Sequence, residues 1–438
     1  MNPSDIAEQT LAAVGKDANA EVVVTDGRTA LTRFANSFIH QNITQDTVTV
    51  ELRVEVDGRV SSSSATVAEP DALARLAHAT VESARLQPID DEWPGLTAPV
   101  EVSAVDHYDE ATAVATPDQR AALVGDFIGT GERAAGYLSS EGATVLYANT
   151  LGHSTRGRFT RAILDGIHQT PTSAGSAHSA SVRIADIDAV AGGATALDRA
   201  HRSSEAFDLK RGEYEVVLSP ECVGTIAIFL AVYGFNARAH QEGQSCLRLG
   251  EPQFHPRVNI YDDATDPRAL GVAFDLEGTP KSRLDLVTGG VSSALTHNRR
   301  TAGRSGVAST GHAIPFPIPI GPVPTNLFLE AGEEPVEDMI ASVERGLYVS
   351  TFNYCRVLDP KSLAVTGLTR NGTFMIENGR ITGAVTNLRF TQSFVAALQN
   401  VEGIGDDARF ADSEFGPGFV HVPSLRLAFW NFTGGASG

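Results

Sequence analysis

Two cysteines and two histidines lie close enough together in the sequence to suggest metal chemistry. They are Cys222, His240, Cys246 and His255. Thiolate sulfur and imidazole nitrogen are the usual protein ligands of zinc. The spacing matches no compact zinc finger or knuckle, because the sequence has neither a Cys-x-x-Cys nor a His-x-x-x-His pair. Loop histidines and small buried thiols are therefore the favoured interpretation, and a Cys/His zinc site is the alternative.

Signals for nucleophilic or acid–base chemistry are weaker. The sequence has no Gly-x-Ser-x-Gly nucleophile elbow, and its Gly-rich stretch at 288–293 lacks the strand and helix that frame a nucleotide site. The adjacent Asp262 and Asp263 are followed by Ala-Thr-Asp-Pro, a composition typical of a turn or helix cap. We interpret this pair as a turn feature and not as a catalytic dyad. Residue types alone predict no active site.

Charge and composition exclude several classes of protein. The chain has 438 residues and a formal net charge of −19, with no basic stripe that could neutralise phosphates, so we expect no direct binding to nucleic acid. Three cysteines are too few for a disulfide framework in a chain of this length. The first ten residues lack the basic and apolar regions of a signal peptide. We expect a soluble, cytoplasmic protein.

The longest apolar run, GTIAIFLAVYG at residues 224–234, is about half of the ~20 residues that a membrane span needs. It is flanked by polar sequence rich in Gly and Ser. The run therefore predicts a helix inside the protein. Whether that helix carries chemistry or only packs is the central question for function.

The first half of the chain reads as sheet hairpins with helices. Residues 47–56 alternate polar side chains with valine and leucine, the period of a strand with one wet face, and Asp57-Gly58 predicts a tight hairpin turn after it. Apolar residues recur at helical spacing over 69–86. Further elements are expected as helices at 117–135 and 195–208 and as strands at 143–150 and 155–164.

A second domain is predicted to start at residues 209–220, close to Lys210, where a charged linker precedes a strand. Beyond it lie the apolar helix, a Gly- and Pro-rich loop at 311–326, and a hairpin at 374–385 with Asn378-Gly379 at its turn. We predict an α+β fold of two domains. Residues 1–209 form the N-terminal α+β domain, and residues 210–438 form a mainly antiparallel, sheet-rich domain with a buried helix.

Several stretches together resemble the TldD/PmbA family, the two homologous subunits of a bacterial and archaeal peptidase. The resemblance runs in the same order from about residue 20 to the end of the chain. The stretches that carry it are 33–60, 146–154, 296–313, 324–332 and 372–394. The last two correspond to a family-specific strand and to the C-terminal hairpin. The name "modulator of DNA gyrase", which is attached to this family, does not require contact with DNA.

The resemblance gives the apolar run a specific meaning. In the TldD subunit, the helix at this place carries a His-Glu-x-x-x-His motif, whose histidines bind zinc and whose glutamate acts as general base. Aligned without a gap, the three positions are occupied here by Ile228, Phe229 and Tyr233. The third zinc ligand of that subunit is a cysteine near the C-terminus, and no cysteine follows Cys355 here. The side chains of Ile228, Phe229 and Tyr233 cannot hold a divalent cation or take a proton from water.

The resemblance therefore implies the non-catalytic TldE/PmbA subunit. Such a chain is inactive alone, holds no cofactor, and pairs with a TldD-type catalytic subunit that carries the zinc and degrades or trims peptides and unfolded segments. A homodimer of the isolated chain is compatible with this hypothesis. Tyr233, Asn236, Arg238 and His240 follow the former motif and are candidates for lining a peptide channel, while their other interpretation is a helix end and surface loop.

Two other functions stay open at the level of sequence. One is a self-sufficient hydrolase or transferase with a different nucleophile. The other is a binding or scaffold protein within a biosynthetic pathway. Substrate sequence, cleavage position and oligomer size are not encoded in any motif of the chain.

Overall fold

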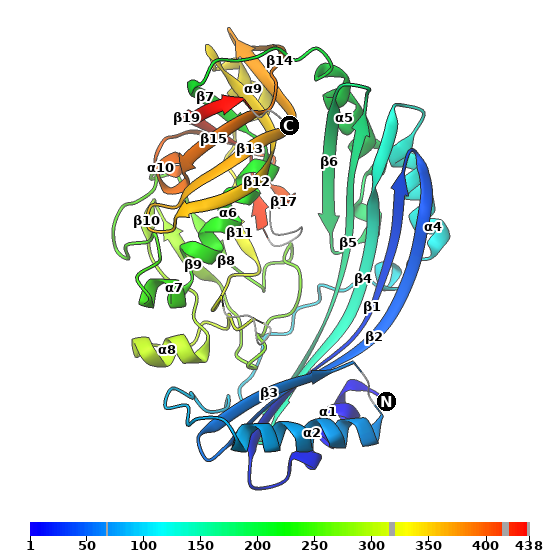
Figure 1. Ribbon diagram of the computed structural model, residues 1–438, viewed down its shortest axis with the longest axis vertical. Helices are drawn as coiled ribbons and strands as arrows, with labels where there is room; N and C mark the ends of the chain where they lie inside the picture. The colour runs from blue at the N-terminus through cyan, green and yellow to red at the C-terminus, as the bar shows by residue number, and fades with distance from the viewer. Residues whose placement is uncertain (67–68, 315–319, 414–419, 436–438) are drawn as a thin grey trace.

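The computed structural model describes residues 1–66, 69–314, 320–413 and 420–435. Within these ranges the strands form three sheets. The first is built from strands before residue 182, and the other two from strands after residue 211. In Figure 1 the first sheet runs along one side of the molecule and the other two lie beside it. The predicted α+β class and the preference for antiparallel pairing are confirmed.

The N-terminal sheet is built from long antiparallel strands in the order β3-β2-β1-β4-β5-β6. Their bounds are β1 (Asn19–Ala35), β2 (Phe38–Val56), β3 (Arg59–Ala65), β4 (Arg133–Asn149), β5 (Ser154–Gln169) and β6 (Ala174–Ser181). The turn between β2 and β3 is the predicted Asp57-Gly58 pair, with φ of 49° and 76°. Positive φ at both positions suits a type I′ hairpin turn. The predicted strands are confirmed, and each is longer than its apolar pattern suggested.

Helices cover the two ends of this sheet (Figure 1). At one end, α1 (Pro3–Val14) and α2 (Pro70–Arg85) pack their apolar sides on valines and a leucine of β1 and β2. At the other end, α4 (Pro117–Ile128) and α5 (Ala189–Arg202) enclose a second core with β4 and β5. Two short helical segments, α3 (Glu110–Ala113) and the 3-10 helix Ile184–Asp186, lie on the connections.

Two helix boundaries differ from the sequence prediction for local reasons. The helix expected to reach residue 135 ends at Ile128, because Gly129 takes a φ of 53° and the chain then joins β4. The helix expected near 195–208 begins at Ala189, where the side chain of Asp188 accepts a hydrogen bond from the Ala191 N–H. An aspartate at this cap position stabilises the first turn.

One C-terminal sheet closes on itself. The strands β12, β7, β19, β15 and β13 are hydrogen-bonded in that order, and β12 also pairs with β13. Its strands are β7 (Gly212–Leu218), β12 (Arg345–Asp359), β13 (Ala364–Glu377), β14 (Arg380–Ala384), β15 (Leu388–Ser393), β16 (Val401–Ile404) and β19 (Leu425–Gly435). The predicted turn at Asn378-Gly379 joins β13 to β14, with φ of 50° and 75°.

The remaining sheet has short strands in the order β10-β9-β8-β11-β18-β17. They are β8 (Ile260–Asp262), β9 (Leu284–Thr288), β10 (Val291–Ser292), β11 (Leu327–Leu329), β17 (Arg409–Ala411) and β18 (Val420–Val422). The helix α6 (Pro220–Tyr233) contacts strands of both C-terminal sheets. Four short helices complete this half, namely α7 (Ala237–Gln241), α8 (Arg299–Ser305), α9 (Val336–Ala341) and α10 (Phe394–Gln399).

Two expectations concern membranes and the long loop. No helix in the described ranges is long and apolar enough to cross a bilayer. Part of the Gly- and Pro-rich loop predicted at 311–326 lies outside the described residues, since 315–319 are among those not described. The domain boundary near Lys210 stays a prediction, although the sheets separate at about that point.

Candidate functional site

The helix α6 begins and ends as its sequence requires, and it is buried. Pro220 occupies its first turn, where a missing N–H costs nothing. Every residue from Pro220 to Ala231 is buried. A helix that is apolar on all sides belongs in a core. The predicted buried helix is therefore confirmed.

The three motif positions on α6 are packed against other side chains. Ile228 is 6% exposed and Phe229 is 1% exposed. The Phe229 ring meets Phe394 of α10 edge-on at 5.8 Å and stacks on Tyr233, one turn along the helix, at 6.1 Å. Hydrocarbon and phenol groups packed in this way do not fit a zinc ion, which needs nitrogen, sulfur or carboxylate ligands.

The four cysteine and histidine candidates are not assembled into a ligand set. Within the part of the chain that the structure describes, no group of three or more His, Cys, Asp or Glu side chains is placed to hold a metal. Cys222 is buried and its Sγ donates to the Val349 carbonyl at 3.4 Å, while His240 is exposed. Burial raises the pKa of Cys246 to about 12 and that of Cys222 well above its usual value, so both remain thiols. The zinc alternative finds no support here.

The four channel candidates occupy different environments. Tyr233 is half-buried in its stack with Phe229. Asn236 is buried, and its side chain caps α7 by accepting from the N–H groups of Arg238 and Ala239, while its amide donates to the Ile320 carbonyl. The Arg238 guanidinium lies 2.8 Å from Glu242, and His240 is exposed. Their role in a channel stays a prediction.

A charged cluster lies where the start of α6 meets the N-terminal sheet. Glu221 is 7% exposed and its carboxylate is 3.0 Å from the guanidinium of Arg409 in β17. Across from them, Asp165 of β5 and His178 of β6 are paired in the strand register. Both ring nitrogens of His178 are buried without a hydrogen-bond partner among the described residues.

The titration of this cluster follows from its burial. Burial opposes ionisation of Glu221, but Arg409 and Arg199 hold its pKa at about 2. Burial, with the charges of Asp412 and Glu221, raises the pKa of Asp165 to about 7. Burial also lowers the pKa of His178 to about 4. At neutral pH the histidine is neutral and Asp165 is close to half-protonated.

A cavity of about 580 Å³ opens beside this cluster, between β6 and the strands β17 and β18. Its walls carry ionisable groups from both halves of the chain, among them His107, Arg183, Arg268, Arg409 and His421. The sequence offered no signal for this cavity, since its lining residues come from distant segments.

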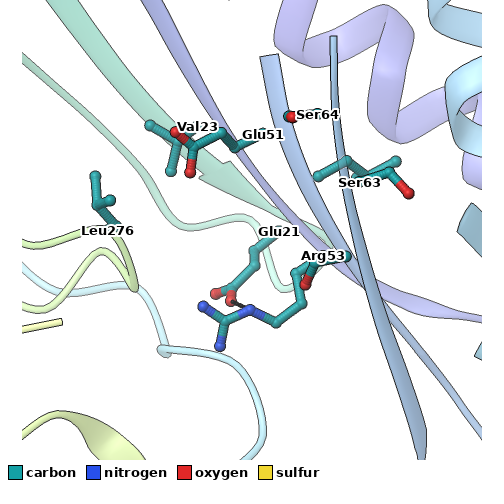
Figure 2. Close-up of a pocket in the computed structure, with 9 residues that line it drawn as sticks. Glu21, Val23, Glu51, Arg53, Ser63, Ser64 and Leu276 are labelled. Atoms are coloured by element: carbon teal, nitrogen blue, oxygen red, sulfur yellow. Dashed lines mark ion pairs between the residues drawn. The ribbon is translucent and has the colours of Figure 1, made fainter. Parts of the chain in front are cut away.

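A second cavity, of about 280 Å³, lies between β1–β3 and a C-terminal loop. Figure 2 shows Glu21 and Arg53 pointing toward one another in it, with Leu276 on the other wall. The Arg53 guanidinium is 3.0 Å from Glu21 and 3.2 Å from Glu277, and the Tyr147 hydroxyl donates to Glu21 at 2.8 Å. Burial raises the pKa of Glu21. This network joins the two halves of the molecule.

The turn interpretation of the aspartate pair is right for one residue and wrong for the other. Asp263 accepts from the N–H and the hydroxyl of Thr265, which is a local turn. Asp262 instead ends β8 in the core, where its carboxylate is 3.0 Å from Nε2 of His312 and accepts from the Asn326 N–H. Both side chains of this hydrogen-bonded pair are fully buried. The sequence could not show this, because His312 lies in a distant loop.

Comparison with known proteins places this arrangement in a family. The model of the PmbA/TldA metallopeptidase C-terminal domain matches residues 211–434. A metalloprotease of Methanothermobacter thermautotrophicus is 26% identical over 232 residues, which cover 52% of this chain and 50% of that protein. A TldD homologue of Haemophilus influenzae is 26% identical over 226 residues, covering 50% of this chain and 46% of its own length. The chain thus spans about half the length of the curated relatives it matches.

Solved structures share the fold over almost the whole chain. TldE from Thermococcus kodakarensis superposes with a TM-score of 0.87 at 17% identity, covering 98% of this chain and 99% of that one. A protein of Thermotoga maritima described as a modulator of a DNA gyrase gives a TM-score of 0.84 at 18% identity, with 98% and 100% covered. At such identities the likeness concerns the fold alone. The family model, which matches residues 211–434 and so more than half of the chain, shows that the chain belongs to the TldD/PmbA metallopeptidase family.

Proposed function

We propose that this chain is a TldE/PmbA-type, non-catalytic subunit of a TldD/TldE-type zinc metallopeptidase that degrades or trims peptides and unfolded segments. The observation that carries the proposal is the packing of α6. Its three motif positions hold Ile228, Phe229 and Tyr233, and the first two are core residues. In this proposal the zinc and its ligands belong to a TldD-type partner, and both subunits work in the cytoplasm.

The role of this chain is then to shape the space in which a peptide is held. Two of its cavities, of about 280 and 580 Å³, lie between the N-terminal sheet and the C-terminal half. The larger of the two runs beside β6 and β17, which are the outer strands of their sheets. Edge strands can bind an extended peptide by main-chain hydrogen bonds. Enclosing the peptide in a shared cavity would orient it and exclude bulk water from the partner's reaction.

Reconstitution with a partner tests the proposal directly. Cleavage of a flexible peptide should appear when the chain is mixed with a paralogue that carries the His-Glu-x-x-x-His motif, and not with either chain alone. The matched control is the same paralogue with its motif glutamate replaced by glutamine, which should be inactive in the mixture. Chelator-resistant cleavage by this chain alone would overturn the proposal and favour a self-sufficient hydrolase.

Metal content offers a second test that needs no substrate. Elemental analysis of the dialysed chain should find far less than one zinc per chain. One tightly held equivalent would contradict the proposal. It would also make Cys222, His240, Cys246 and His255 the candidate ligands of that zinc.

A further inference from the structure

A third cavity between the two halves combines apolar walls with one buried ammonium group. It measures about 310 Å³ and lies between β5 and the loops on either side of residue 275. This volume is at the lower end of those that bind small ligands. Most of its wall is hydrocarbon, contributed by Phe159, Leu270, Val272, Phe274, Leu276 and Ile314.

The wall also contains Asp275 and Arg161, whose guanidinium pairs with Glu141 at 2.7 Å. Its buried cation is Lys281. It is 6% exposed, and its Nζ donates to the hydroxyl of Thr325 at 2.6 Å. Among the residues described by the structure, no carboxylate forms an ion pair with it. An ammonium group has three N–H donors, and burying such a charge without a counterion is costly. Thr325 satisfies one of these donors, and Asp262 lies close enough to attract the charge without forming an ion pair with it.

The acidic groups around this cavity are already engaged. Asp262 pairs with His312. Asp275, in the cavity wall, accepts from the backbone N–H groups of Glu277, Thr279 and Ala313. Burial and the nearby charge of Glu277 raise the pKa of Asp275 to about 7, so it supplies only part of a negative charge at neutral pH. A positive centre thus faces a mostly apolar space.

The position of Lys281 is unusual for this chain. The sequence contains only three other lysines, Lys16, Lys210 and Lys361, and all three are exposed. A lysine with no role beyond solubility belongs with them at the surface. The buried lysine is also the one that lines a cavity.

We propose that this cavity binds a carboxylate attached to an apolar group, with Lys281 as its counterion and the wall around Val272 and Phe274 as its apolar contact. That the ligand is a peptide rests on the proposed function. That it carries a carboxylate and an apolar group rests on the residues that line the cavity. The carboxylate is either the C-terminus of a peptide or an acidic side chain next to an apolar one.

Calorimetric titration of the isolated chain separates these sources. The probes are N-acetyl-Ala-Leu with a free carboxylate, the same dipeptide as its C-terminal amide, and N-acetyl-Leu-Glu-amide. At least one carboxylate probe should bind about tenfold more tightly than N-acetyl-Ala-Leu-amide, the effect of one charged hydrogen-bonded pair. Lys281→Met should remove that preference, and Lys210→Met, at an exposed position, should keep it.

Further variants keep the test decisive. If Lys281→Met does not fold, Val272→Phe is used instead, because it fills the cavity from a half-buried position in its wall and should abolish binding of the carboxylate probe. Equal affinity for the carboxylate and the amide, undiminished binding by Val272→Phe, or no binding of any probe would overturn the proposal. Since no partner is present, these failures leave partner-dependent hydrolysis untouched.

Discussion

Phe229 and its neighbours make α6 a core element. The Phe229 ring lies between the rings of Phe394 and Tyr233. Contacts of this kind stabilise by excluding water and filling space. The same side chains have no proton to exchange at neutral pH and no lone pair suited to zinc.

The first prediction follows from this packing. Phe229→Ala should lower the free energy of unfolding by ~3–5 kcal/mol, because it removes a buried ring and leaves a cavity. Chemical denaturation measures the change. Phe38→Ala is the control, since Phe38 is 57% exposed and its loss should change stability by less than about 0.5 kcal/mol. Equal effects of the two substitutions would contradict the buried role of Phe229.

The second prediction concerns the pH dependence of the charged cluster beside α6. With its pKa raised from 3.8 to about 7, Asp165 binds more proton in the folded than in the unfolded state, so its contribution to stability falls as pH rises through that window. His178, with its pKa lowered from 6.5 to about 4, has the opposite effect between those values. The two contributions partly cancel in the wild type.

Asp165→Asn removes only the first contribution. The stability of this variant relative to wild type should therefore increase from pH 4.5 to pH 7.5, as followed by urea denaturation at both values. Asp126→Asn, at an exposed position in α4, serves as the control and should show no such trend. A difference between wild type and Asp165→Asn that is the same at both pH values would show that Asp165 titrates normally.

At the level of elements, close contact between α4 and α5 depends on a glycine. A Cβ added to Gly193 would lie 2.3 Å from the Phe127 carbonyl oxygen, whereas one added to the adjacent Gly192 would meet only the Phe127 ring at 3.7 Å. The first distance is far inside van der Waals contact, and the second is ordinary. The two helices can pack at this distance only because Gly193 has no side chain.

This pair of glycines provides the third prediction. Gly193→Ala should destabilise the protein by about 1–3 kcal/mol, because the helices must separate to admit the methyl group. Gly192→Ala should be neutral or stabilising by up to about 1 kcal/mol, since alanine is the better helix former. Thermal unfolding of the two variants makes the comparison. If Gly193→Ala stabilises the protein, a methyl group fits between α4 and α5 and the two helices do not depend on this glycine.

At the level of the whole molecule, buried ion pairs hold the N-terminal sheet to the C-terminal half. Arg53 of β2 links Glu21 of β1 with Glu277 of the C-terminal loop, and both carboxylate side chains are at most 6% exposed. A second, half-buried link joins Asp90, which follows α2, to Arg300 of α8. The first of these links lines the cavity of about 280 Å³.

The fourth prediction tests the first of these links. Arg53→Met should destabilise by about 3–5 kcal/mol, because it leaves two carboxylates buried together without their counterion. Arg28→Met should cost less than about 1 kcal/mol, since Arg28 and Asp46 form an exposed pair. Guanidinium denaturation of both variants decides the matter. If Arg53→Met lowers the free energy of unfolding by less than about 1 kcal/mol, the network stabilises the protein no more than an exposed ion pair does.

Local structure was predictable because its causes lie within a few residues. Asp57-Gly58 and Asn378-Gly379 are hairpin turns, since both positions of each turn need positive φ, which Gly and Asn adopt readily. The helix at 70–85 follows from apolar spacing, and the burial of α6 follows from the absence of any polar face. Helix ends were less predictable, because α4 stops at Ile128, where Gly129 takes a φ of 53° and the chain then joins β4.

Only the tertiary structure revealed the cavities and the charges within them. Glu221 and Arg409 are 188 residues apart in sequence, and Arg53 and Glu277 are 224 apart. The sequence by itself determined the α+β class, the main hairpins and the family resemblance, because each depends on residue types at short spacings. The burial of Lys281, the raised pKa of Asp165 and the pairing of Asp262 with His312 were decided by folding, since desolvation depends on every segment that packs around a group.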